Sequence, residues 1–558
     1  LCMEQLGQKQ EAVIHLLEAV DLATDKRSFT YALVVALRNI KRLPTSEKLR
    51  TVLLELLNQN HVNPRSISAA IQASIREQDG VPELFAGLNR DPEAPLDELA
   101  PHSGTIRTLL ADDLYRAFLE NAPVTDTDLE ILLTLLRRTL LEAIQAPGSI
   151  ASDLIDSWTE DRLSVATMLA RQGWLNEYVF YTTAAEHEAL GHLQKALANC
   201  AASEQAFWEM LAVAAAYTPI YGWELELPAT EIPDSFAPII KQHIEDTDKE
   251  MQIRSSLATL TPMQDQTSLA VQDQYENNPY PRWTRYDVRP PMSLSECVQA
   301  DLPHLSQARL PNPERPRVLI AGCGTGIQTM KAATGYANAS ILAVDLSRAS
   351  LAYGMRMLEE YGIDSVDHLN ADILDLDQLD EQFDLVESYG VIHHMADTGK
   401  AMGLLANRLK PGGIMYLGLY SEIGRQSVVK VRELIAQRGY SQDDSGIRQA
   451  RRDIMRELDP ALAPLLSPAS DFWTMSDTRD LIFHVQVHRF TLLRIGKMIA
   501  ACGLTFLGLA LRNPADRLAF NREFTDKDAA RDINSWHSFE VKHPETFGDT
   551  YKIWLRKG

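Results

Sequence analysis

The sequence predicts a multidomain protein with an all-α N-terminal part and a C-terminal α/β part built on a doubly wound sheet. Apolar residues recur at helical spacing through residues 1–250, with few β-branched runs. From Arg317 onward, short apolar strands alternate with helical stretches, which is typical of βαβ units and a parallel sheet. The first of these strands runs directly into a glycine-rich turn. These observations predict a change from helix packing to a covered sheet.

The helical part, residues 1–250, opens with the segment LGQKQEAVIHLLEAVDLATD. Gly7 stands at the expected turn, and Ala12 and Ala19 share one face of the helix that follows. The segment resembles the second half of a tetratricopeptide repeat that is truncated at its start. One such unit cannot bury its apolar face alone and needs stacked neighbours. A plain helical bundle remains the alternative for the residues that follow.

Residues 251–300 have a different composition and are expected to form a linker with an aromatic lid segment. The stretch QDQYENNPYPRWTRYD, at 272–287, combines two prolines with tyrosines and a tryptophan. It is either a connection whose aromatic side chains pack on the next domain or a lid over a functional site, since loops often carry function. Tyr275 and Tyr280 are the candidate lid residues.

The α/β domain is expected over residues 301–558, with insertions at about 421–490 and 514–548. The expected strands are RVLIAG at 317–322, SILAVDLS at 340–347, HLNADILDL at 368–376, FDLVESYG at 383–390, GGIMYLGLY at 412–420, LTFLGLALR at 504–512 and TYKIWLRKG at 550–558. Their apolar character predicts a sheet that is covered on both faces.

The glycine turn contains Gly322, Gly324 and Gly326, directly between a strand and a helix. Such a turn lets a ligand approach the backbone and the N–H groups at the start of the helix. A dinucleotide fingerprint would place its third glycine at position 327, which is Ile327. The pattern G-x-G-x-G therefore indicates a different nucleotide ligand. Cys323 lies inside the turn, where packing is its simplest role.

Acidic residues stand at the ends of the next strands. Asp345 ends the second strand, where a carboxylate can accept two hydrogen bonds from a ribose diol. Asp372 follows the third strand and can accept from an adenine amino group, with Ile373 against the ring. Glu387 ends the fourth strand, at the carboxyl edge that faces ligands in doubly wound sheets.

Residues 272–558 resemble a class I S-adenosylmethionine-dependent methyltransferase, through GCGTG, Asp345, NADIL, VIHHM and LKPGG. The whole chain resembles bacterial methyltransferases with N-terminal tetratricopeptide-like helices, through QYENNPYPRW, DLIFHVQVHRFT and HPETFGDTYKIW. The resemblance implies a Rossmann-like fold, a last strand that runs antiparallel, and S-adenosyl-L-methionine as the cofactor. We predict a cofactor site made of Gly322, Cys323, Gly324, Gly326, Asp345, Leu346, Asp372, Ile373, Glu387 and Tyr275.

The candidate catalytic residues are His394, His484, His488 and Tyr280. His394 follows the fourth strand, and an unperturbed imidazole pKa of about 6.5 suits a general base. A structural histidine is the alternative. In a helix or a strand, His484 and His488 would share a face. No metal is predicted, because a helix would separate Asp480 from His488 by about 12 Å, too far for one ion to be shared easily.

The acceptor is expected to be a protein or peptide held by the helical domain. A small or lipid-like metabolite and a non-catalytic cofactor-binding scaffold are the alternatives. No nucleic-acid partner is expected, because the net charge is −22 and the fourth strand ends in Glu-Ser-Tyr-Gly rather than in Asp/Asn-Pro-Pro-Tyr/Phe. Five cysteines without a CxxC pair and no apolar run near the roughly 18 residues of a membrane span favour a cytoplasmic protein, with a homo-oligomer left open.

Overall fold

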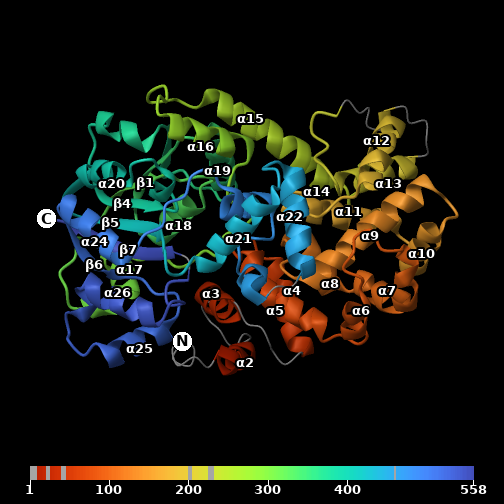
Figure 1. Ribbon diagram of the computed structural model, residues 1–558, viewed down its shortest axis with the longest axis horizontal. Coiled ribbons are helices and arrows are strands. Elements are labelled where there is room, and N and C mark those ends of the chain that lie inside the picture. Colours follow the sequence, from red (N-terminus) through yellow and green to blue (C-terminus); the bar gives the residue numbers. More distant parts are fainter. Residues whose placement is uncertain are drawn as a thin grey trace. The chain divides into compact units, whose positions relative to one another are not determined.

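The computed structural model describes residues 9–19, 26–38, 46–198, 204–223, 232–457, 460–548 and 550–558. The chain divides into two compact units, whose elements are labelled in Figure 1. The helical unit comprises Lys9–Asp248 and Val431–Phe483, and the sheet unit contains Lys249–Lys430 and His484–Gly558. Gly7, Cys2 and Cys200 lie outside the described residues.

The helical unit confirms the all-α prediction for the N-terminal part. Its helices are α2 (Lys9–Ala19), α3 (Lys26–Leu37), α4 (Glu47–Leu57), α5 (Pro64–Arg76), α6 (Val81–Gly87), α7 (Ser103–Ala111), α8 (Asp113–Asn121), α9 (Thr127–Gln145), α10 (Ile150–Trp158), α11 (Arg162–Leu175), α12 (Ala184–Ala198), α13 (Glu204–Ala215), α14 (Ala237–Ile240), α22 (Asp444–Glu457) and α23 (Met475–Thr478). Helix starts follow from capping side chains: Ser46 accepts from the Leu49 N–H, and Asp112 from the Tyr115 N–H. Tetratricopeptide repeats within this unit stay a prediction.

Residues 431–483 belong to the helical unit, although they were expected as part of an insertion in the α/β domain. Arg451 on α22 donates to both carboxylate oxygens of Glu130 on α9, at 2.8 and 2.9 Å, and both side chains are buried. The Ser476 hydroxyl donates to Glu177 at 2.7 Å. These contacts join segments that lie far apart in sequence, which periodicity alone cannot reveal.

The sheet unit contains one seven-stranded sheet with the order β3-β2-β1-β4-β5-β7-β6. Its strands are β1 (Arg317–Ala321), β2 (Ser340–Asp345), β3 (Val366–Asn370), β4 (Phe383–Tyr389), β5 (Leu409–Tyr420), β6 (Leu504–Leu509) and β7 (Thr550–Lys557). β1 pairs in parallel with β2 and β4, whereas β7 runs antiparallel between β5 and β6. The predicted doubly wound sheet with a final antiparallel strand is therefore confirmed.

The sheet is apolar on both faces because successive residues of each buried strand point to opposite sides. Leu319 belongs to one core cluster, and its neighbours Val318 and Ile320 belong to the other. The helices of this unit are α16 (Gln266–Asn277), α17 (Leu294–Asp301), α18 (Ile327–Gly335), α19 (Arg348–Glu360), α20 (Thr398–Asn407), α24 (Leu492–Ala501), α25 (Pro514–Glu523) and α26 (Ile533–Lys542). Helices α15 (Asp246–Ser256) and α21 (Gln426–Arg438) cross the boundaries of the two units.

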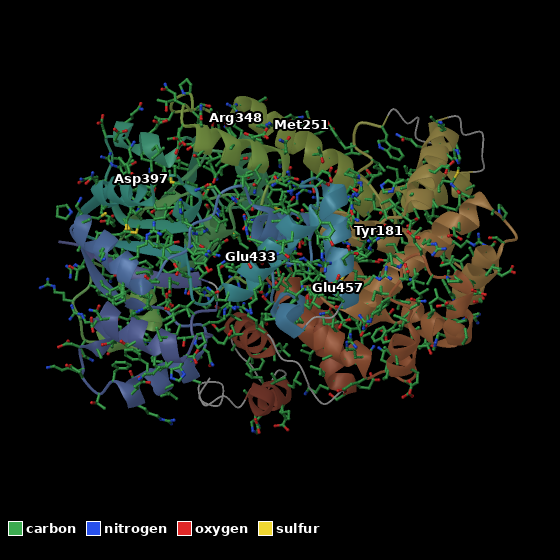
Figure 2. The ribbon with its side chains drawn as sticks, viewed as in Figure 1. Tyr181, Met251, Arg348, Asp397, Glu433 and Glu457 are labelled. Carbon is green, nitrogen blue, oxygen red and sulfur yellow. The ribbon has the colours of Figure 1, made fainter. Side chains whose placement is uncertain are left out.

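The segment expected as a linker is more regular than predicted, since α16 and all but the last residue of α17 lie within residues 251–300. Asp265 caps α16 by accepting from the Ser268 N–H at 2.8 Å. Arg348, labelled in Figure 2, anchors the preceding stretch by donating to the carbonyls of Arg254 and Leu257, at 2.7 and 3.0 Å. No helix among the described residues is long and apolar enough to cross a membrane.

Candidate active site

The glycine turn joins β1 to α18, and Gly322, Gly324 and Gly326 all have positive φ angles, of 77°, 52° and 85°. Gly322 also lacks room for a side chain, because a Cβ there would come within 2.4 Å of Val391. Val391 belongs to the loop after β4, so this close approach joins two strand ends at the edge of the sheet. The N–H groups of Gly322, Gly324 and Gly326 already donate to Val344, Asp345 and Cys323. The glycines therefore serve to let a ligand approach the backbone closely at the start of α18.

Asp345 stands beside this turn at the end of β2 and is buried. Its Oδ2 accepts from the Gly324 N–H at 2.7 Å, and its Oδ1 accepts from the Ser347 N–H at 2.9 Å. Burial raises the pKa of Asp345 to about 6, although the two backbone hydrogen bonds act in the opposite direction. A carboxylate oxygen has two lone pairs, so each oxygen can still accept one hydroxyl proton. Two adjacent acceptors fit a ribose diol.

Two amide side chains fix the position of the loop after β2 by hydrogen bonding. The Leu346 carbonyl accepts from Gln272 Nε2 at 2.8 Å and from Asn370 Nδ2 at 2.9 Å. Asp372, beyond the neighbouring β3, is buried and accepts from the Leu374 N–H at 2.9 Å, so it caps the short helix that follows. The sheet order therefore brings the residues predicted for the ribose and the adenine to adjacent strand ends.

Glu387 at the end of β4 is buried and accepts from Gln328 Nε2 and from the Tyr336 hydroxyl, both on or directly after α18. These contacts tie β4 to the helix that follows the glycine turn. Burial and the nearby Glu387 raise the pKa of Tyr336 well above its ordinary value, so its hydroxyl stays a donor. Cys323 is buried, and burial raises the pKa of its thiol well above the ordinary range. A thiol of this kind is a poor nucleophile.

The aromatic segment is fastened to the glycine turn. Trp283 Nε1 donates to the Thr325 carbonyl at 2.9 Å, and the Thr325 hydroxyl donates to the Pro281 carbonyl. The Tyr280 carbonyl lies 3.0 Å from the position of a Cβ at Gly324. Trp283 is buried in a cluster with Tyr353, so for this side chain the packing alternative describes its environment. Tyr280 is half-buried.

Three histidines gather on the loop side of β4. His393 and His394 belong to the short helix Ile392–His394, and His484 follows residue 483 on the returning chain. The rings of His394 and His484 stack with centroids 3.7 Å apart, and the Tyr275 hydroxyl lies 3.2 Å from His484 Nε2. The structure thus brings together three of the predicted site residues, His394, His484 and Tyr275.

The backbone of one residue, Gln486, orients both stacked imidazoles. The Gln486 carbonyl lies 2.6 Å from His394 Nδ1 and can only accept, so His394 carries a proton on Nδ1. In the neutral ring the lone pair is then on Nε2. The Gln486 N–H donates to His484 Nδ1 at 3.0 Å, which leaves the proton of the neutral His484 ring on Nε2, toward Tyr275. His394 is therefore oriented as a base, and His484 as a donor.

His488 does not share this arrangement. Residues 484–489 form neither a helix nor a strand, so the expectation that His484 and His488 share a face through regular structure is wrong. His488 is half-buried, its Nε2 lies 3.0 Å from Gln486 Nε2, and its backbone N–H donates to the His393 carbonyl. A π-helical turn over Arg479–Phe483 ends the regular structure before this stretch.

Sequence reasoning missed Tyr420 and Arg425 as neighbours of the histidine cluster. The His393 and Tyr420 ring centroids are 3.7 Å apart, and the Arg425 guanidinium lies 3.6 Å from the centroid of the Tyr420 ring. Burial, with added repulsion from His394 and Arg425, lowers the pKa of His393 well below its ordinary value. The sequence did hold a signal for Tyr420, which ends the expected fifth strand. Parallel strands present their carboxyl ends at one edge of the sheet, so Tyr420 could have been placed near the residues after β4.

Helix α16 links the two halves of the site. Gln272 contacts the loop after Asp345, and Tyr275, three residues later on the same helix, contacts His484. Val391 at the glycine turn lies two residues before His393. The cofactor-type site and the histidine cluster are thus neighbours at one edge of the sheet.

Comparisons with known proteins relate the sheet unit to methyltransferases. The family described as "Methyltransferase domain" matches residues 318–413. An uncharacterized protein of Synechococcus is 30% identical over 303 residues, which cover 52% of this chain and 71% of that protein. The trans-aconitate 2-methyltransferase of Deinococcus radiodurans is 32% identical over 105 residues, covering 18% of this chain and 38% of that enzyme.

Two further comparisons extend these findings. The ubiquinone biosynthesis O-methyltransferase of Brucella anthropi is 25% identical over 205 residues, covering 32% of this chain and 77% of that enzyme. The structure of PKMT2 from Rickettsia typhi in complex with AdoHcy is 18% identical, with a TM-score of 0.37, and covers 47% of this chain and 52% of that one. The chain is thus a methyltransferase whose cofactor is S-adenosylmethionine, and it belongs to the class I S-adenosylmethionine-dependent methyltransferases.

Proposed function

We propose that the chain transfers a methyl group to a protein or peptide acceptor that reaches the histidine cluster. The connectivity of the helical unit carries this proposal. The chain leaves the sheet unit after Lys430, shortly after Tyr420 and Arg425, and re-enters it at His484. The helical unit is therefore connected along the chain to residues of the histidine cluster, in addition to its N-terminal link. Stacked helices offer extended surfaces that suit polypeptide recognition.

For the cofactor, we propose that Gly322, Gly324 and Gly326 hold the methionine end and that Asp345 accepts from the ribose hydroxyls. Asp372 and Ile373 are assigned to the adenine. The cofactor supplies an electrophilic methyl group on a positively charged sulfur. The side chains around it act mainly by placing the acceptor in line with that methyl group, which is worth up to roughly 7–11 kcal/mol in well-oriented reactions.

His394 is proposed to accept the proton of the acceptor nucleophile through Nε2. The Gln486 carbonyl supports this role, because it holds the Nδ1 proton and stabilises the imidazolium that forms. The cofactor, when bound, would supply the methyl group and keep the electron pair of its carbon–sulfur bond. His484 and Tyr275 are proposed to orient the acceptor by hydrogen bonding, and Tyr280 to close the site over the glycine turn.

A small-molecule acceptor is the second candidate, and the burial of the cluster favours it. His393, His394 and His484 expose at most 4% of their surface, so a large acceptor has to insert a slender side chain. The names of two relatives refer to small molecules: a trans-aconitate 2-methyltransferase and a ubiquinone biosynthesis O-methyltransferase. Elemental analysis of the purified protein tests the prediction that it uses no resident metal.

The test incubates the full chain with methyl-labelled S-adenosylmethionine and a bacterial extract, followed by size separation with and without protease. Label in a protease-sensitive fraction is expected, and label only among small molecules would favour the second candidate. The Gly324→Arg variant is the control for cofactor-dependent labelling. Labelling no higher than this control, in the presence of normal cofactor binding by the unaltered chain, would contradict turnover and favour a non-catalytic scaffold.

A further inference from the structure

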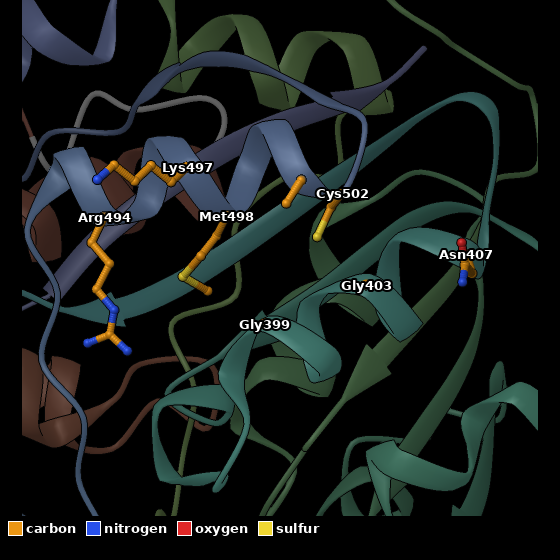
Figure 3. Close-up of a pocket in the computed structure, with 8 residues that line it drawn as sticks. Gly399, Gly403, Asn407, Arg494, Lys497, Met498 and Cys502 are labelled. Atoms are coloured by element: carbon orange, nitrogen blue, oxygen red, sulfur yellow. The ribbon is translucent and has the colours of Figure 1, made fainter.

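A groove in the sheet unit lies outside the candidate active site, between helices α20 and α24. Figure 3 shows α24 contributing Arg494, Lys497 and Met498, while α20 contributes Gly399 and Gly403. The groove has a volume of about 520 Å³, which falls within the roughly 300–1,000 Å³ of small-molecule sites. None of these residues takes part in the proposed reaction.

Two glycines leave one side of this groove without side chains. Gly399 and Gly403 lie four positions apart on α20 and therefore share a face, although glycine in a helix is less stable than alanine. A Cβ at Gly403 would meet no described atom within 4 Å, and one at Gly399 would meet only Asp397 Oδ1 at 3.5 Å. Asp397, the cap of α20, is labelled in Figure 2. Packing of the described chain thus does not require either glycine.

The opposite side of the groove carries positive charge. Arg494 and Lys497 are exposed and lie three positions apart on α24. Neither side chain forms an ion pair with any residue that the structure describes, and Arg494 packs on the Phe490 ring at 4.6 Å. The lining residues include no acid. Asp397 beside Gly399 carries the opposite charge, but its Oδ1 already accepts from the Lys400 N–H at 2.9 Å. On a chain with a net charge of −22, the two cations of α24 mark a local preference for anions.

We propose that this groove binds a medium-chain carboxylate, with its alkyl chain along α20 and its carboxylate between Arg494 and Lys497. Met498 and Cys502 provide the apolar wall, and the glycine face provides room for the chain. From Gly399 to Asn407 the helix is about 12 Å long, close to the length of extended decanoate. The site is independent of the acceptor and stands whether or not the proposed function holds.

The test measures decanoate binding to the full chain by isothermal titration calorimetry, with decanol as the uncharged comparison. One-to-one binding of decanoate, at least tenfold tighter than that of decanol, is expected. Gly403→Leu fills the groove and should weaken binding at least tenfold. Gly191→Leu is the matched control, because Gly191 lies within α12 and a Cβ there also meets no described atom within 4 Å.

Charge reversal tests the anion preference separately. Arg494→Glu/Lys497→Glu should weaken decanoate binding at least tenfold, whereas the same change at the exposed Arg315 and Lys527 should not. The S-adenosylmethionine affinity of each variant reports whether the sheet unit has folded. Equal binding of decanol and decanoate, binding that survives Gly403→Leu, or no binding by the unaltered chain would each overturn the proposal. A Gly403→Leu variant that changes only the oligomeric state would assign the groove to a second copy of the chain instead.

Discussion

At the scale of single residues, Asp345 combines burial with two short backbone hydrogen bonds. The sequence predicted its place at the end of a strand, since an apolar run ends there. It could not predict the raised pKa, because that depends on how completely the glycine turn and α16 cover the carboxylate. The same limit applies to His394 and His484, whose opposite tautomers depend on the backbone N–H and carbonyl of Gln486, 92 residues away from His394.

Cofactor affinity should depend on the ionisation of Asp345. Its pKa in the fold is about 6, against an ordinary value of 3.8, so the neutral form is favoured by folding and the charged form is favoured by ribose hydroxyl donors. As the pH falls below 6, the dissociation constant of the cofactor should rise by up to about tenfold per pH unit. Over the same fall, from pH 6 to about 4, the unliganded fold should gain stability, because the folded state binds the proton more tightly than the unfolded state does. Calorimetric titration between pH 5 and 8 checks this. In Asp345→Asn the affinity should be weaker and nearly independent of pH, and a wild-type affinity that is constant across this range contradicts the assignment.

His394 and His484 should respond differently to substitution. His394→Gln should lower kcat by about 10²–10⁴-fold and leave the cofactor affinity unchanged, because it removes the proposed base. His484→Gln keeps a side-chain donor and should cost less. Steady-state rates with an identified acceptor, measured at saturating cofactor, check the order of the two effects. Equal losses, or a larger loss for His484→Gln, would remove His394 from its role as base.

At the scale of elements, strand identities followed from sequence better than helix identities. Six of the seven strands are largely apolar and flanked by turn residues, so they were predictable. The third, β3, is Val-Asp-His-Leu-Asn, and the strand expected at 368–376 is wrong beyond Asn370, because Asp372 caps a short helix there. Helix α16 was not predicted, because QTSLAVQDQYEN has few apolar positions. It depends on its Asp265 cap and on contacts within the sheet unit. The stretch 484–489 was expected to be a helix or a strand, but it is neither. Its backbone pairs instead with His393 and His394, through the His488 N–H and the Gln486 carbonyl.

Substitutions in the aromatic segment separate packing from closure. Trp283→Ala should lower the free energy of unfolding by about 3–5 kcal/mol, since Trp283 is buried with Tyr353 and Met357. Tyr280→Ala should change stability by less than about 1 kcal/mol and reduce turnover more than cofactor affinity. Urea unfolding and steady-state kinetics on both variants check the distinction. A Tyr280→Ala variant that loses as much stability as Trp283→Ala would return Tyr280 to a packing role.

At the scale of the whole molecule, the sequence indicated a helical part followed by a sheet part, but not the chain's return to the helical unit. Residues 431–483 lie within the α/β sequence, and their place depends on the Arg451–Glu130 pair, between residues 321 positions apart. Removal of residues 1–250 would leave Arg451 buried without its partner. Point substitutions are therefore the cleaner way to separate the roles of the two units.

The Arg451–Glu130 pair should be essential to the helical unit. Glu130→Ala leaves a buried guanidinium without its carboxylate and should cost about 3–5 kcal/mol in the free energy of unfolding. Glu130→Leu/Arg451→Met removes both charges and should recover much of that loss. Chemical denaturation monitored by circular dichroism measures both variants, and a Glu130→Ala loss below about 1 kcal/mol would show that the pair contributes little.

The measurement that tests the central assignment most directly is the binding of S-adenosylmethionine to the full chain and to two glycine variants, by calorimetry. The unaltered chain should bind one equivalent. Gly324→Arg should abolish binding, because the side chain enters the turn beneath the Tyr280 carbonyl. Gly362→Arg should bind normally, since Gly362 has a similar positive φ of 65° and a Cβ there meets no described atom within 4 Å. Retained binding by Gly324→Arg, or equal loss in both variants, would contradict the placement of the cofactor at the glycine turn.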